Sequence, residues 1–107
     1  MSMNATQFTR VAKALADPRR FELLEMIAGD EEVACKRMVE AFPVSQATIS
    51  HHLKELATAG LIEARREGQC GHYRVRPGVL DAYLAEVARR LRAQPDERPA
   101  RATVTIG

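Results

Sequence analysis

Apolar residues recur along most of the chain at intervals of three and four, which is the period of an amphipathic helix. Phe8, Val11, Ala12 and Leu15 occupy positions i, i+3, i+4 and i+7 of one such stripe. The stripe predicts a first helix that ends near Ala16.

A second helix is predicted to begin at Asp17-Pro18. The Asp17 carboxylate suits the N-cap position, and proline at the first helical position loses no needed donor. Gly29 supplies a natural end, and residues 29–32 read as a polar loop. The positions expected to face the core are Phe21, Leu24 and Ile27.

A short third helix follows and is closed by Pro43, because the residue before a proline is pushed out of helical geometry. Its apolar stripe is Cys35, Met38, Val39 and Phe42. Ser45 then serves as the N-cap of a fourth helix that runs to about Ala59, before Gly60. The inward stripe of the fourth helix is Ile49, His52, Leu53 and Leu56.

From residue 61 the period changes to two. Residues 61–67 and 72–76 predict two strands joined by a glycine-containing turn at 68–71, which makes a hairpin. Pro77 opens a fifth helix, and after Arg92 the pattern stops. The apolar stripe of the fifth helix is Leu80, Tyr83, Leu84, Val87 and Leu91. We expect residues 1–93 to form one domain and 94–107 a disordered tail.

The predicted fold is mainly α with a small β-hairpin: a winged helix-turn-helix of five helices and a two-stranded wing. The short third helix, the turn at residues 42–44 and the fourth helix form the helix-turn-helix unit, whose second helix lies in the major groove of DNA. The outward side chains expected to read bases are Gln46, Ser50 and His51. Those expected at phosphates are Ser45, Thr48 and Lys54. The wing is expected to reach the minor groove or the flanking phosphates through Arg65, Arg66, His72 and Arg74.

Two simpler interpretations compete with this one. A polar outer face is often only a solvated face, and a winged-helix scaffold can serve as a protein-interaction module without sequence-specific DNA binding. His52 lies in the apolar stripe, so we interpret it as a packed structural histidine rather than a DNA contact.

Composition narrows the function classes. The 107 residues suffice for one core, and the net charge of +2 gives only weak support for a nucleic-acid partner. No apolar run approaches a membrane span, and the first ten residues do not read as a signal peptide, so a cytoplasmic location is expected. No glycine-rich phosphate loop, paired carboxylates or Cys/His nucleophile arrangement is evident, so we expect neither an enzyme nor a cofactor.

Four segments resemble the ArsR/SmtB family of bacterial repressors: ALADPRR at 14–20, VSQATISHHLKEL at 44–56, AGLI at 59–62 and GHYRV at 71–75. The resemblance covers roughly residues 11–91. It implies a homodimer formed through the first and last helices. It also implies binding to an inverted repeat in double-stranded DNA and repression released by an inducer.

The sequence departs from the metal sites found in many family members. Cys35 lies where clustered cysteines are typical, but no second cysteine is near it. Asp81 and Glu86 lie on the last helix, yet Tyr83 stands where a histidine would be needed. A zinc or soft-metal site uses three or four N or S ligands. No metal is therefore expected, and a metal-responsive repressor with a non-standard site remains an alternative.

Two cysteines, Cys35 and Cys70, are candidate thiol sensors. Cys35 is interpreted first as a small buried hydrophobe, but it also lies near a helix N-terminus beside Lys36 and Arg37, which favours a reactive thiolate. Cys70 is expected at the wing tip. The identity of the inducer stays open between a metal, an oxidant and a small molecule.

Overall fold

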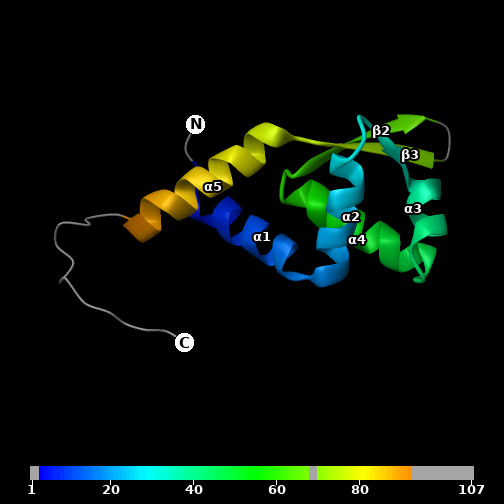
Figure 1. Ribbon diagram of the computed structural model, residues 1–107, viewed down its shortest axis with the longest axis horizontal. Helices are drawn as coiled ribbons and strands as arrows, with labels where there is room; N and C mark the ends of the chain where they lie inside the picture. The colour runs from blue at the N-terminus through cyan, green and yellow to red at the C-terminus, as the bar shows by residue number, and fades with distance from the viewer. Residues whose placement is uncertain (1–2, 68–69, 93–107) are drawn as a thin grey trace.

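The computed structural model describes residues 3–67 and 70–92. Figure 1 shows helices gathered around a small sheet, in the order α1, α2, β1, α3, α4, β2, β3 and α5. The elements are α1 (Ala5–Ala16), α2 (Pro18–Ala28), β1 (Val33–Ala34), α3 (Cys35–Ala41), α4 (Gln46–Thr58), β2 (Ile62–Glu67), β3 (Cys70–Val75) and α5 (Pro77–Arg92). The predicted fold class of five helices with a small antiparallel β unit is confirmed.

Side-chain caps set the helix starts. The Asp17 carboxylate accepts a hydrogen bond from the backbone N–H of Arg20 at 3.0 Å, and the Ser45 hydroxyl accepts one from the N–H of Thr48 at 3.1 Å. Each bond satisfies a donor that the first helical turn leaves unpaired. Both predicted starts are therefore correct, and the bond to Asp17 lowers the pKa of its carboxyl group.

The sheet has one more strand than predicted. β1 pairs with β3, and β3 pairs with β2, all antiparallel in the order β1-β3-β2. Two residues are too few to give an alternating pattern, so Val33 and Ala34 were expected only near a loop. Their strand geometry comes from pairing with Tyr73 and His72, forty residues further along the chain.

The predicted turn at 68–71 is too long. Cys70 and Gly71 already belong to β3, opposite Glu67 and Arg66 of β2. The ladder therefore extends two residues further than the alternation of apolar side chains indicated. Residues 68–69 and the expected tail at 94–107 lie outside the described residues.

The core lies between α1, α2, α3, α4 and the sheet. Its fully buried side chains include Val11, Leu23, Ile27, Val33, Met38, Ile49, Leu56 and Leu61. Phe21 was predicted to face this core but is 43% exposed, and Leu23 is buried in its place. A helix turns by about 100° per residue, so Phe21 points about 110° away from the centre of the buried stripe formed by Leu23, Leu24 and Ile27. In that direction its side chain faces solvent rather than the neighbouring helices.

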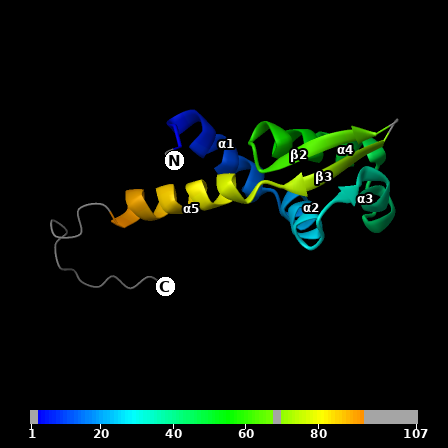
Figure 2. The same cartoon turned by 90° about the horizontal axis from the view of Figure 1, so that it is seen from above.

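α1 and α5 form the end of the molecule opposite α3 and the far ends of β2 and β3 (Figures 1 and 2). The Phe8 and Tyr83 rings join the two helices, with centroids 5.1 Å apart. Leu84 and Leu91 belong to the predicted apolar stripe of α5, yet they are 54% and 69% exposed. No helix among the described residues is long and apolar enough to cross a membrane.

Glu86 of α5 is buried although it is a charged residue. Its carboxylate accepts hydrogen bonds from Arg89 at 2.6 Å and Arg90 at 2.8 Å. These two guanidinium groups lower the pKa of Glu86 to about 2. Arg90 also lies over the Phe8 ring, 3.8 Å from its centroid, so the cluster ties α5 to α1.

Candidate DNA-binding surface

α4 presents a polar face to solvent because its apolar residues are taken up by the core. Ile49, Leu53 and Leu56 are buried, as their spacing predicts. The exposed side chains of the opposite face are Gln46, Ser50, His51 and Lys54. All the candidate base contacts therefore lie on one exposed side of a helix that is anchored along its other side.

The N-terminal turn of α4 holds the candidate phosphate contacts. Ser45 and Thr48 are both exposed, and the Ser45 hydroxyl donates a hydrogen bond to the Thr48 hydroxyl at 3.0 Å. Free backbone N–H groups at a helix N-terminus favour an anion. The turn thus offers hydroxyl and amide donors next to the candidate base contacts.

His52 points the other way, into the protein, and is 8% exposed. Arg20 of α2 donates a hydrogen bond from Nε to His52 Nδ1 at 3.4 Å. Burial lowers the pKa of His52, and Asp17 opposes this effect only in part. The neutral ring therefore fixes α4 against α2, in line with its prediction as a packed histidine. Arg20 was missed as a partner, because nothing local relates it to a residue thirty-two positions away.

The two faces of the wing carry different residues. Residues paired across an antiparallel ladder share a face. Arg65 pairs with His72 and Glu63 with Arg74, so the predicted contacts Arg65, His72 and Arg74 share one face. Arg66 pairs with Gly71 on the other face. Of the four predicted wing contacts, only Arg66 therefore lies on the face that also carries Ala64 and Tyr73 and is turned toward α4.

Carboxylates already engage two of these wing arginines. Arg65 holds Glu32 with two hydrogen bonds of 2.7 and 3.0 Å, which lower the pKa of Glu32. Arg74 donates to Glu63 at 3.0 Å. His72 is only half-buried as a residue, but its Nδ1 atom is buried without a hydrogen-bond partner.

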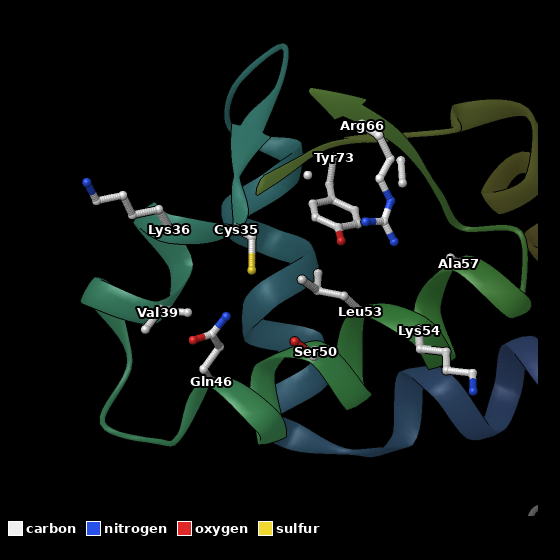
Figure 3. Close-up of a pocket in the computed structure, with 12 residues that line it drawn as sticks. Cys35, Lys36, Val39, Gln46, Ser50, Leu53, Lys54, Ala57, Arg66 and Tyr73 are labelled. Carbon is white, nitrogen blue, oxygen red and sulfur yellow. The ribbon is translucent and has the colours of Figure 1, made fainter. Parts of the chain in front are cut away.

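An open cavity of about 580 Å³ lies between α3, α4 and the wing (Figure 3). The Cys35 thiol and the Tyr73 ring border it on one side, and Gln46, Ser50 and Lys54 of α4 lie along the other. Tyr73 was missed as a site residue, because an aromatic residue in a strand usually signals core packing. Burial raises the pKa of the Tyr73 hydroxyl, so it stays protonated at neutral pH.

The other chemical candidates are scattered. Cys35 is half-buried at the start of α3, and the side chain of Cys70 lies outside the described part of the chain. Within residues 3–67 and 70–92, no three histidine, cysteine, aspartate or glutamate side chains come together as a metal site. Glu86 is occupied by its two arginines, and Asp81 is exposed on α5.

Comparison with known proteins gives the same fold and class. A family model described as a helix-turn-helix domain matches residues 15–65. The chain is 34% identical over 79 residues to an arsenical resistance operon repressor of Staphylococcus xylosus, covering 74% of this chain and 75% of that protein. It is 37% identical over 103 residues to an arsenic resistance transcriptional regulator of Pseudomonas putida, covering 83% of this chain and 80% of that protein.

Two solved structures are similar over most of the chain. An ArsR-like transcriptional regulator from Rhodococcus sp. RHA1 aligns with a TM-score of 0.75 at 28% identity, covering 89% of this chain and 88% of that one. A homodimeric winged helix-turn-helix DNA-binding domain from Mycobacterium bovis aligns with a TM-score of 0.65 at 35% identity, covering 81% and 83%. With its recognition helix, wing and these relatives, the chain belongs to the ArsR family of helix-turn-helix transcriptional regulators.

Proposed function

We propose that this regulator is a homodimeric repressor that binds an inverted-repeat operator and is released by an inducer or by thiol oxidation. The observation that carries the proposal is the exposed polar face of α4, which is fixed to the core from behind and flanked by the wing. Relatives more than 30% identical are named operon repressors, which supports the same role here.

The side chains of α4 divide by the chemistry they offer. Gln46 suits the paired donor and acceptor of adenine, and Ser50 and His51 suit base edges further along the groove. Ser45, Thr48 and Lys54 suit phosphates, which set the position of the helix but carry no sequence information. On the wing, Arg65 and Arg74 would have to break their ion pairs with Glu32 and Glu63 in order to contact DNA. Arg66 has no ion pair among the described residues, so it can contact DNA without that cost.

Self-association is assigned to the end formed by α1 and α5. Leu84 and Leu91 expose apolar surface there, and a second copy would cover it. A two-fold axis at this end would present two copies of α4, and dimers of this type read half-sites about 34–36 Å apart along DNA. The solved relative from Mycobacterium bovis is described as a homodimer, which supports this arrangement.

Thiol oxidation is the release route that the residues themselves suggest. Hydrogen peroxide converts a thiol to a sulfenic acid with release of water. Cys35 borders the cavity beside α4, so a bulkier and more polar group there would disturb the reading face. A gel-shift titration with and without peroxide tests this on the unaltered chain and on Cys35→Ser and Cys70→Ser variants, and the substitution of the sensing cysteine should abolish the effect. Unchanged operator affinity under peroxide would remove thiol oxidation from the proposal.

The test of the function itself begins with selection of binding sites from a random duplex library. Fluorescence anisotropy then compares the selected site with a scrambled duplex of the same length at several salt concentrations. We expect an inverted repeat, and an affinity that falls steeply as salt rises. Gln46→Ala should weaken the selected site by about 1–3 kcal/mol, or roughly 5- to 160-fold.

Thr58→Ala is the matched control, because Thr58 is exposed at the opposite end of the same helix. It should leave affinity unchanged. Equal binding to selected and scrambled duplexes would refute sequence-specific recognition. Salt-independent binding, or no binding at all, would instead favour the interpretation as a protein-interaction module.

A further inference from the structure

We propose that the cavity between α3, α4 and the wing binds a small organic anion with an apolar body, and that this anion excludes DNA from α4. The second half of the proposal rests on the DNA-binding function proposed above. The first half is a property of the cavity alone.

The size of the cavity fits a small molecule. Its volume of about 580 Å³ lies within the range of roughly 300–1,000 Å³ that is usual for ligand sites. Side chains of three separate elements border it, so it is not merely the groove between neighbouring side chains of one helix. Figure 3 shows Cys35 of α3 and Tyr73 and Arg66 of the wing facing α4 across this space, with the ammonium ends of Lys36 and Lys54 turned away from it.

The positive charge of the residues that line the cavity favours an anionic ligand. Lys36, Lys54 and Arg66 all border the cavity, and no aspartate or glutamate among the described residues does. Across the described residues, none of the three takes part in an ion pair, whereas the neighbouring Arg37 and Arg65 are paired with Asp30 and Glu32. A cation from each of three elements borders the cavity, and the flexible stems of Lys36 and Lys54 allow their ammonium groups to turn toward a ligand carboxylate, which would neutralise this positive charge.

The apolar residues at the floor of the cavity favour a ligand that also has an apolar part. Leu53 and Val39 contribute aliphatic surface, and the Tyr73 ring packs so closely on Gly71 that an added Cβ there would lie 3.0 Å from the Tyr73 hydroxyl oxygen. The ring therefore lies over Gly71 of its own strand and borders the cavity. Its protonated hydroxyl can donate a hydrogen bond to a ligand oxygen. A DNA phosphate uses the cations but gains nothing from this apolar floor.

The site overlaps the surface assigned to DNA. Gln46, Ser50 and Lys54 border the cavity and also form much of the exposed face of α4. A bound anion would neutralise Lys54 and Arg66 and crowd Gln46. Ligand and operator therefore compete for the same side chains, which would make the ligand an inducer.

Direct binding is measured first, without DNA, by NMR of the ¹⁵N-labelled full chain. The probes are 2-naphthoate and octanoate, and 2-naphthamide serves as the uncharged partner of the aromatic probe. We expect saturable shifts of cavity amides, such as those of Cys35, Val39 and Tyr73, with at least one carboxylate and much weaker shifts with the amide. Absence of such shifts with both carboxylates, or an equal response to 2-naphthamide, would overturn the proposal.

Single substitutions then test where in the cavity the carboxylate binds. Lys36→Gln should weaken carboxylate binding by about 2- to 5-fold, the usual effect of one solvent-accessible charge pair. The matched control is Arg37→Gln, which removes the next cation of α3 from outside the cavity and should leave binding unchanged. Ala64→Phe fills the cavity from β2 and should abolish binding while the rest of the spectrum stays folded. Equal effects of the Lys36 and Arg37 variants would contradict the assignment.

Competition is tested last, by displacing labelled operator with the bound carboxylate. Displacement from the unaltered chain but not from Ala64→Phe supports the inducer role. Carboxylate binding without displacement would refute the exclusion of DNA and leave the cavity as a ligand site. Cavity binding in a chain that recognises no operator would instead refute the proposed function and uphold the site.

Discussion

The adjacent histidines of α4 allow stability and DNA recognition to be separated with two single substitutions. His51 is exposed on the face of α4 proposed to contact bases, and His52 is buried against Arg20 of α2. We expect His51→Ala to impair operator binding without changing stability. We expect His52→Ala to do the reverse.

The cost of His52→Ala follows from two losses. The hydrogen bond from Arg20, at 3.4 Å, contributes about 0.5–1.5 kcal/mol, toward the lower end for a bond of that length. Removing a buried ring leaves a void whose walls collapse only in part. Together we expect about 1.5–3 kcal/mol. At about 4–8 °C per kcal/mol for a domain of this size, the melting temperature should fall by roughly 10 °C.

The pH dependence gives a second signature of His52. Burial lowers the pKa of His52, whereas the unfolded chain keeps a value near 6.5. Below about pH 6.5 the unfolded state therefore binds more protons than the folded state, and stability falls as the pH drops. Asp17, Arg20, Arg19 and His51 surround the ring and do not reverse this direction. His52→Ala should flatten the stability profile below pH 6.5.

The assay is thermal unfolding at one fixed protein concentration, since dimer stability depends on concentration. Operator anisotropy is measured at 10 °C, where both variants are folded. His51→Ala should change unfolding by less than about 0.5 kcal/mol and weaken the operator by roughly 5- to 160-fold. A His52 variant with unaltered melting and lost operator binding would refute the assignment of the two rings.

Three further changes test other parts of the structure. Glu86→Gln should remove the part that Glu86 contributes to the loss of stability as the pH falls from about 4.5 toward 2, because the pKa of Glu86 is held near 2 by Arg89 and Arg90; urea midpoints between pH 3 and 5 measure this. Gly60→Ala should cost about 1–2 kcal/mol in urea unfolding, because Gly60 has a φ of 85°, where a Cβ is strained. Leu84→Asp should produce monomers in analytical ultracentrifugation, because the charge would lie in the proposed dimer interface.

Each of these tests can fail in a distinct way. An acid profile that Glu86→Gln leaves unchanged would mean that the ion pairs do not stabilise the fold. A stable Gly60→Ala variant would mean that the turn after α4 relaxes to another conformation. If the Leu84→Asp variant dimerises as tightly as the unaltered chain, the dimer interface does not include this face of α5. Thr58→Ala, at an exposed position of α4, is again a suitable control.

The sequence alone determined the helices, because their signals are local. A carboxylate before a proline predicts the start of α2, and a serine after a proline-containing turn predicts the start of α4; the capping bonds at Asp17 and Ser45 follow from residues three positions away. Spacing within α4 was enough to separate buried His52 from exposed His51.

Only the tertiary structure decided how these elements meet. The strand character of Val33 and the burial of Leu23 in preference to Phe21 depend on neighbours that are distant in the chain. The same is true of the wing, where the register of the ladder separates Arg66 from Arg65. The cavity beside Tyr73 exists only where three elements converge, because periodicity encodes which face of an element is apolar but not what that face will contact.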